Sequence, residues 1–219
     1  MQINILTLFP EYFDSILATS ILKRALASGL ITVNIINIRD FASDKHQVTD
    51  DRPFGGGPGM VMKVEPIYLA LESLGQVTSQ PGMKRILTSA KGPVFTQAKA
   101  GELAKLEQLT LICGHYEGVD ERVAENLVDE EMRIGDYVLT GGEPAVAVII
   151  DAVSRLIPGI LGNEESNKNE SHSQPGKLGF PVYTRPEEFN GWRVPEVLLG
   201  GHHAEIQKWR EMQSKLSEN

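Results

Sequence analysis

The sequence has almost none of the residues that cross-link a chain or hold a structural metal. It contains one cysteine, Cys113, in 219 residues, so an intrachain disulfide is impossible. The neighbours of Cys113 are Leu and Ile rather than basic residues, which favours a buried strand thiol over a nucleophile. The spacings H-x-x-x-H and C-x-x-C are both missing. We therefore expect no structural metal.

Long apolar runs are missing too. The longest, Ala145 to Ile150, is far shorter than the roughly 20 residues of a membrane span. The start of the chain, Met1 to Ile5, lacks the basic residues and long apolar core of a signal peptide. With 41% hydrophobic and 23% charged residues, the composition is that of a globular domain. The sequence predicts a cytoplasmic protein with no membrane partner.

The chain has fewer basic than acidic residues, 21 Lys and Arg against 29 Asp and Glu. The net charge of -8 repels a polyanion, which argues against a nonspecific nucleic-acid binder. A specific RNA enzyme remains compatible with this charge if Lys and Arg gather on the face that meets phosphate.

The common nucleotide-binding fingerprints do not occur. No G-x-G-x-x-G follows a predicted strand, and the first strand-to-helix junction, Thr7 to Glu11, has no glycine. This argues against a Rossmann dinucleotide enzyme and against a Rossmann-type methyltransferase. A G-x-x-x-x-G-K-[ST] loop is also missing, which argues against a P-loop NTPase. The cluster Gly55 to Gly59 lies within a loop, and we interpret it as a tight turn that approaches a partner chain or RNA backbone.

Hydrophobic patterns predict alternating strands and helices up to Leu156. Such alternation is typical of an α/β fold with a mainly parallel sheet covered on both faces. A long polar segment is expected over 39–60. The expected strands are 3–8, 31–38, 85–88, 109–113 and 132–134, and the expected helices are 9–26, 64–74, 97–106, 121–127 and 144–156.

A change in composition at Gly162 divides the chain. From Gly162 to Lys177 there is no aliphatic residue and no Phe, Tyr or Trp, so this stretch cannot offset its ordering entropy by burial. We expect an α/β domain over 1–161, a flexible linker over 162–177 and a small helical C-terminal domain over 178–219. In the last, Ala204 to Leu216 carries apolar residues at helical spacing.

Glycine-rich segments follow the predicted strands at 89–92, 114–118, 134–142 and 158–159. Glycine lets backbone groups approach a ligand closely, and ligands of open parallel sheets bind outside the carboxyl ends of the strands. Any one of these loops alone is more typical of an ordinary turn. Three of them at one sheet edge favour a ligand site.

Five long motifs together resemble the bacterial tRNA (guanine-N1)-methyltransferase family, in order from Met1 to about Ser214. They are Asp50 to Met60, Cys113 to Arg122, Ile134 to Glu143, Arg155 to Gly159, and Tyr183 to Pro186. The resemblance implies a SPOUT-type α/β domain with a deep trefoil knot, which periodicity could not have predicted. It also implies a homodimer with shared active sites, and tRNA as the partner.

The same resemblance implies that S-adenosyl-L-methionine binds in the knot, and it marks a set of positions for this cofactor. They are Leu87, Thr88, Ser89, Gly92, Gly114, Tyr116, Glu117, Gly118, Ile134, Gly135, Asp136, Tyr137, Val138, Leu139, Gly141, Gly142 and Pro144. His115 stands where the family commonly has Arg.

Methylation of guanine at N1 requires a base and a cation. N1 carries a proton at neutral pH, and its removal places charge on O6, so a carboxylate near N1 and a guanidinium near O6 are needed. The resemblance assigns the second role to Arg155 and the first to Glu170. Alignment from the C-terminal side places Ser171 at the position of the base instead, and Ser cannot act in this way. Glu117 is a second carboxylate that could serve the base or a magnesium ion.

Basic and imidazole side chains in three segments are the predicted RNA contacts: Lys45, His46, Arg52, Arg185, His202 and His203. Each alone is also typical of a solvated surface group. Two alternatives stay open: a SPOUT-type enzyme that methylates another base or the ribose, and an RNA-binding module without catalysis.

Overall fold

The computed structural model describes residues 1–162, 170–174 and 177–214. The chain divides into two compact units, Met1–Gly162 and Asn163–Asn219. Most of the predicted linker, namely 163–169 and 175–176, lies outside the described residues. Among the described residues, no helix has both the length and the apolar character needed to cross a membrane.

The first unit contains a five-stranded sheet with the order β2-β1-β6-β5-β7. Every neighbouring pair in it is parallel. This confirms the predicted α/β fold with a mainly parallel sheet. The strands are β1 (Gln2–Thr7), β2 (Thr32–Asn37), β5 (Met83–Thr88), β6 (Gln108–Ile112) and β7 (Glu130–Met132).

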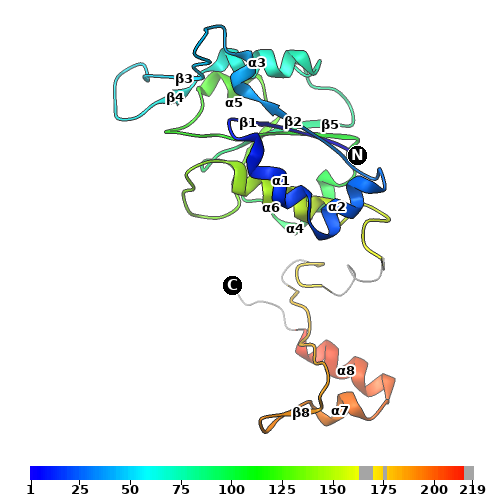
Figure 1. Ribbon diagram of the computed structural model, residues 1–219. Helices are drawn as coiled ribbons and strands as arrows, with labels where there is room; N and C mark the ends of the chain where they lie inside the picture. The colour runs from blue at the N-terminus through cyan, green and yellow to red at the C-terminus, as the bar shows by residue number, and fades with distance from the viewer. Residues whose placement is uncertain (163–169, 175–176, 215–219) are drawn as a thin grey trace. The chain divides into compact units, whose positions relative to one another are not determined.

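Helices cover both faces of this sheet (Figure 1). One face carries α3 (Val64–Ser73) and α5 (Glu121–Asn126), and the other carries α1 (Asp14–Leu17), α2 (Ser20–Ala27), α4 (Gln97–Leu103) and α6 (Glu143–Ser154). Two hydrophobic clusters form the core, one on each face. Helix α6 buries an apolar stripe at i, i+3 and i, i+4 spacing: Ala145, Val146, Ile149, Ile150 and Val153.

The single helix predicted over 9–26 is wrong. The structure has a 3-10 turn, Pro10–Phe13, followed by α1 and α2. Thr19 is extended, with φ -119° and ψ 142°, and Ser20 has φ 49°. These backbone angles interrupt the helix, although the apolar spacing continues through it. Strand β7 also begins two residues before the predicted strand.

The segment predicted to be polar, 39–60, contains most of a 3-10 turn at its start and one short strand further on. The 3-10 turn Ile38–Phe41 follows β2, and β3 (Asp50–Asp51) pairs with β4 (Val61–Met62) in an antiparallel ribbon. The glycine cluster 55–59 forms the loop of this ribbon. Met62 N donates to Gly118 O at 2.9 Å, and Asp120 N donates to Met62 O at 3.0 Å. The ribbon is thereby attached to the loop after β6.

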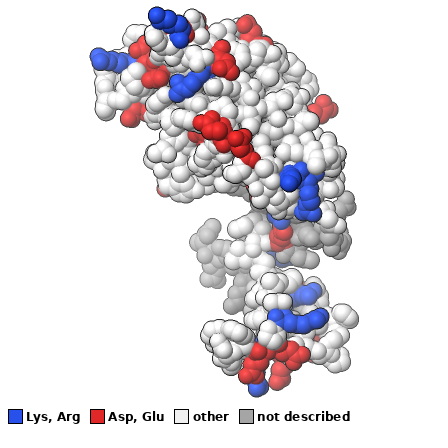
Figure 2. Space-filling view, viewed as in Figure 1, with Lys and Arg blue, Asp and Glu red and all other residues white. Residues whose placement is uncertain are grey.

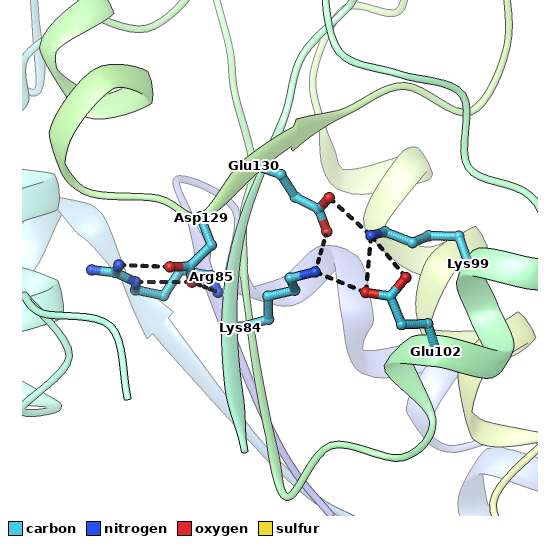
Figure 3. A network of polar contacts seen from close by, with 6 residues as sticks. All are labelled: Lys84, Arg85, Lys99, Glu102, Asp129 and Glu130. Carbon is cyan, nitrogen blue, oxygen red and sulfur yellow. Dashed lines mark hydrogen bonds and ion pairs between the residues drawn. The ribbon is translucent and has the colours of Figure 1, made fainter. Parts of the chain in front are cut away.

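A network of charged side chains joins β5 to β7 and α4 (Figure 3). Arg85, which is buried, donates from Nε and Nη2 to the two oxygens of Asp129, at 3.2 and 2.9 Å. Beside it, Lys84 lies 2.9 Å from Glu102, and Lys99 lies 2.9 Å from Glu130. Burial tends to raise the pKa of Asp129, but hydrogen bonds from Arg85 outweigh this and lower it below 3.8. The pair is therefore charged at neutral pH.

We expect Asp129→Asn to lower the free energy of unfolding by about 3 kcal/mol, because it leaves the Arg85 charge buried without its counter-charge. The lowered pKa gives stability that is present above the unfolded-state value and is lost as pH falls below about 4. Urea unfolding at pH 7 and pH 3.5 measures both effects. Glu102→Gln is the matched control, since its exposed ion pair is worth under about 1 kcal/mol. Equal stability of the two variants would contradict this expectation.

The second unit contains a hairpin and two helices. Strands β8 (Glu188–Phe189) and β9 (Trp192–Arg193) form the hairpin, followed by α7 (Glu196–Leu199) and α8 (His203–Gln213). The rings of Tyr183 and Trp209 are 6.4 Å apart. In the predicted helix Ala204 to Leu216, Ile206 and Trp209 are half-buried as expected, whereas Met212 is 65% exposed. Leu216 lies outside the described residues.

Candidate active site

A cavity of about 280 Å³ lies at the carboxyl ends of β5, β6 and β7. The three loops that follow these strands line it, so the convergence predicted from the glycine-rich segments is observed. All but three of the positions predicted for the cofactor are in its lining. Those present are Leu87, Thr88, Ser89, Gly114, Tyr116, Glu117, Gly118, Ile134, Gly135, Tyr137, Val138, Leu139, Gly141 and Gly142.

Gly92, Asp136 and Pro144 are not in the lining. A Cβ at Gly92 would lie 2.4 Å from Met132 N, so this glycine packs against the backbone of β7 instead. Asp136 turns outward, where it forms an ion pair with Arg133 at 2.8 Å. Pro144 belongs to the first turn of α6. These three positions, predicted to bind the cofactor, thus lie outside the cavity lining.

Glycines allow the three loops to touch. Gly142 N donates to Gly114 O at 2.7 Å, and Gly114 N donates to Thr88 Oγ1 at 3.2 Å. A Cβ on Gly142 would lie 2.0 Å from Thr88 Oγ1 and 2.8 Å from Cys113 Cα. A Cβ on Gly114 would lie 2.8 Å from Thr88 O. The backbones of the loops after β5, β6 and β7 are therefore in direct contact.

The chain after β7 is hydrogen-bonded to the loop after β5. Ser89 N donates to Met132 O at 2.9 Å, Arg133 N to Pro93 O at 3.0 Å, and Phe95 N to Arg133 O at 2.8 Å. The guanidinium of Arg133 also donates to the carbonyl of Gly92. These bonds fix the start of the loop that encloses the cavity.

Sequence analysis missed several lining residues that carry charge. Lys91 forms an ion pair with Glu121 at 2.7 Å, and hydrogen bonding to this carboxylate raises the pKa of Lys91. Arg133 and Glu131 also line the cavity. Lys91, Glu121 and Arg133 lie next to the predicted motifs or within them, but only the tertiary structure shows that their side chains reach the cavity.

A cluster of polar side chains lies behind the wall formed by His115 and Gly141. Glu143, which is 4% exposed, accepts from Thr7 Oγ1 at 2.7 Å. Cys113 is fully buried, as expected, although it follows the last residue of β6 instead of lying in the strand. Burial, with a contribution from the Glu143 charge, raises its pKa well above the ordinary value. Cys113 is thus a thiol at neutral pH and not a nucleophile.

Glu117 extends from the loop after β6 towards the glycine cluster. A Cβ on Gly59 would lie 2.4 Å from Glu117 Cγ and 2.6 Å from Glu117 Oε1. Glu117 N also donates to Met60 O at 3.0 Å. The turn at Gly59 therefore supports the side chain of Glu117. In the part of the chain that the structure describes, no group of three or more His, Cys, Asp and Glu side chains could hold a metal ion.

The two predicted catalytic residues belong to different units. Arg155 is the C-cap of α6 and is half-buried in the first unit. Glu170 is half-buried in the second unit, where its carbonyl accepts from Ser173 N at 3.2 Å. Next to it, Ser171 Oγ accepts from Gly179 N at 2.9 Å, which gives this serine a local structural role.

All six predicted RNA contacts are exposed. Lys45, His46 and Arg52 belong to the first unit, and Arg185, His202 and His203 belong to the second. On the faces shown in Figure 2, Lys and Arg are interspersed with Asp and Glu in each unit. Such a surface favours a few specific phosphate contacts over a broad electrostatic attraction.

An open parallel sheet with a glycine-lined cavity outside the carboxyl ends of its strands defines an α/β protein that binds a small ligand. Residues 1–218 match the family described as tRNA (guanine-1)-methyltransferase, TrmD. The chain therefore belongs to this family of SPOUT-class methyltransferases.

Relatives with the same printed name support the assignment. The tRNA (guanine-N(1)-)-methyltransferase of Geotalea uraniireducens is 56% identical over 98% of this chain and 85% of its own length. The enzyme of Carboxydothermus hydrogenoformans is 55% identical over 99% of this chain and 84% of its own length. The enzyme of Ruminiclostridium cellulolyticum is 53% identical over 98% of this chain and 91% of its own length.

Proposed function

We propose that this protein transfers a methyl group from S-adenosyl-L-methionine to N1 of the guanosine immediately 3′ of the anticodon in tRNA. The observation that carries the proposal is the convergence of three glycine loops on one cavity, at positions that the family motifs mark for the cofactor. A side chain at Gly114 or Gly142 would collide with the neighbouring loop, so glycine lets the backbones of these loops form the cavity wall, which suits a ligand held by main-chain groups.

The cofactor supplies an activated methyl group on a sulfonium. The cavity fits a group of this charge, because Glu117, Glu131 and the buried Glu143 lie in its wall or directly behind it. Its basic groups are already paired, Lys91 with Glu121 and Arg133 with Asp136. A net negative wall favours a cationic ligand. Backbone groups of the loops at 114–118 and 134–142 would hold the ligand.

The chain's own residues activate the acceptor base. We assign Glu170 as the general base that takes the proton from guanine N1, and Arg155 as the cation that stabilises the charge developing on O6. A guanidinium suits the second role, since it stays charged and donates in a fixed direction. The remaining task is alignment of the two reactants.

We further propose that the chain forms a homodimer with shared active sites, and that the segment leading into α6 passes through a trefoil knot. The hydrogen bonds that join the loops after β5, β6 and β7 support such threading. The six exposed basic and imidazole residues are our proposed tRNA contacts, and residues 178–219 our proposed tRNA-binding domain.

The proposed reaction is tested with labelled S-adenosyl-L-methionine and an unmodified tRNA that carries guanosine 3′ of the anticodon. Nucleoside analysis after digestion should show 1-methylguanosine, and a tRNA with adenosine at that position should stay unlabelled. A methyl group on a ribose oxygen or on another base would replace this proposal by a different SPOUT activity. Binding of tRNA without any methylation would indicate a non-catalytic module. Repeating the assay with EDTA decides whether magnesium is required.

The support of Glu117 by the turn at Gly59 gives a further prediction. Gly56 and Gly59 have nearly equal positive φ angles, 78° and 76°, so alanine strains the backbone similarly at either position. A Cβ at Gly56 meets nothing within 4 Å, whereas one at Gly59 meets Glu117. We expect Gly59→Ala to reduce the methyl-transfer rate about tenfold by displacing Glu117. Gly56→Ala should keep a methyl-transfer rate within about twofold of wild type. Equal rates for the two variants would show that the turn at Gly59 does not hold Glu117 in place for the reaction.

A further inference from the structure

The polar cluster behind the cavity wall contains a histidine whose inner nitrogen faces a carboxylate. His115 Nδ1 is buried and, among the described residues, has no hydrogen-bond partner. Glu143 Oε2 lies 4.0 Å from this nitrogen. The other oxygen of this carboxylate is already occupied by Thr7. The orphaned nitrogen and the remaining carboxylate oxygen are thus the natural partners of each other.

Gly141 leaves open the space between these two atoms. A Cβ at this position would lie 2.5 Å from His115 Nδ1 and 2.5 Å from Glu143 Oε2. The backbones of His115 and Gly141 also form an isolated antiparallel bridge. The separation exceeds a hydrogen bond by about 1 Å, a gap that polar groups of an active site commonly close when a ligand binds.

The orientation of His115 determines which nitrogen serves the cavity. When Nδ1 carries the proton that faces Glu143, Nε2 has a lone pair and acts as an acceptor. His115 lines the cavity, and its Nε2 is not among the buried polar atoms that lack a partner. The ring packs against Phe9 and Tyr116, with centroids 5.1 and 4.9 Å apart, which limits its rotation.

We infer that His115 binds an N–H group of the cofactor through Nε2, and that Glu143 is the positioning residue that fixes the ring for this contact. The inference rests on the proposed function, because it takes S-adenosyl-L-methionine as the ligand. Two groups of that molecule carry suitable N–H donors, the α-ammonium and the 6-amino group of adenine. An acceptor backed by a buried carboxylate favours a donor of either kind.

Calorimetry of the whole chain with S-adenosylhomocysteine tests the role of His115. His115→Asn keeps a donor near the position of Nδ1 but removes Nε2, and we expect about tenfold weaker binding. His115→Gln places an amide oxygen near the position of Nε2, and we expect binding within about threefold of wild type. Equal affinities of the two variants, or an affinity of His115→Asn within twofold of wild type, would overturn the inference.

Methylthioadenosine identifies the donor, because it keeps the adenine but lacks the amino-acid end. If His115→Asn weakens both ligands equally, the partner is the adenine amino group. If it weakens only S-adenosylhomocysteine, the partner is the α-ammonium. Wild-type protein that binds neither ligand would refute the proposed function itself, which separates that failure from failure of the His115 contact.

If Glu143 positions His115, substitutions at these two residues must have coupled, non-additive effects on ligand binding. Glu143→Gln keeps the shape of the side chain but can turn a donor towards His115, so we expect about fivefold weaker binding of S-adenosylhomocysteine. The double variant with His115→Asn should bind no more weakly than His115→Asn alone. Additive losses would show that Glu143 acts only on the fold and would overturn this part of the inference. Circular dichroism and thermal unfolding of each variant show whether it is folded.

Discussion

We expect Glu170→Ala to lower kcat for methyl transfer by about 1,000-fold, because N1 of guanine then keeps its proton. Arg155→Ala should lower kcat by about 100-fold, because the charge on O6 loses its stabilising cation. The affinity for S-adenosyl-L-methionine should change less than about twofold in both variants, since neither residue lines the cavity. Single-turnover methylation of tRNA and calorimetry of cofactor binding measure the two quantities.

Ser171→Ala is the matched control for Glu170, because alignment from the two sides of this region places either residue at the position of the base. Ser171 accepts a backbone hydrogen bond within its own segment, so its loss should change kcat by less than about threefold. Wild-type kcat in Glu170→Ala would refute the assignment of the base. Arg155→Lys should recover only part of the lost rate, since an ammonium lacks the planar fork of donors.

We expect Gly142→Ala to weaken S-adenosyl-L-methionine binding at least about 100-fold and to lower the free energy of unfolding by about 2 kcal/mol. Gly142 has φ -80°, which any residue can adopt, so backbone strain is not the reason. The added Cβ would lie 2.0 Å from Thr88 Oγ1 and 2.8 Å from the backbone at both Cys113 and Gly114. The loops after β5 and β6 must then separate from the start of α6.

The control for this substitution is Gly101→Ala in α4, where an added Cβ meets nothing within 4 Å. It should raise the free energy of unfolding by about 0.5–1 kcal/mol through helix propensity and leave cofactor binding unchanged. Thermal unfolding and calorimetry compare the two variants. Normal cofactor affinity in Gly142→Ala would mean that the loops tolerate separation and that their contact does not form the binding site.

Local physical chemistry determined the elements of the first unit. The strands β1, β5 and β6 are readable as short runs that are buried almost continuously, which is typical of a parallel sheet covered on both faces, and α6 is readable from its apolar stripe at helical spacing. Helix α2 ends two residues before Gly29, whose φ of 70° is far easier for glycine than for most other residues. Where periodicity failed, between α1 and α2, the backbone at Thr19 and Ser20 leaves the helix although the side-chain pattern does not change.

The sequence by itself determined the family, the α/β class and most positions around the cavity, because long motifs and glycine-rich turns are properties of contiguous residues. Only the tertiary structure decided which side chains meet. Thr7, His115 and Glu143 meet although they come from three segments that are far apart in the sequence. Gly59 and Glu117 likewise meet from two distant segments. Such contacts depend on strand order and on the path of the loops, which no local pattern encodes. The physical reason is that a cavity is formed by surfaces brought together from afar, whereas periodicity reports only on near neighbours.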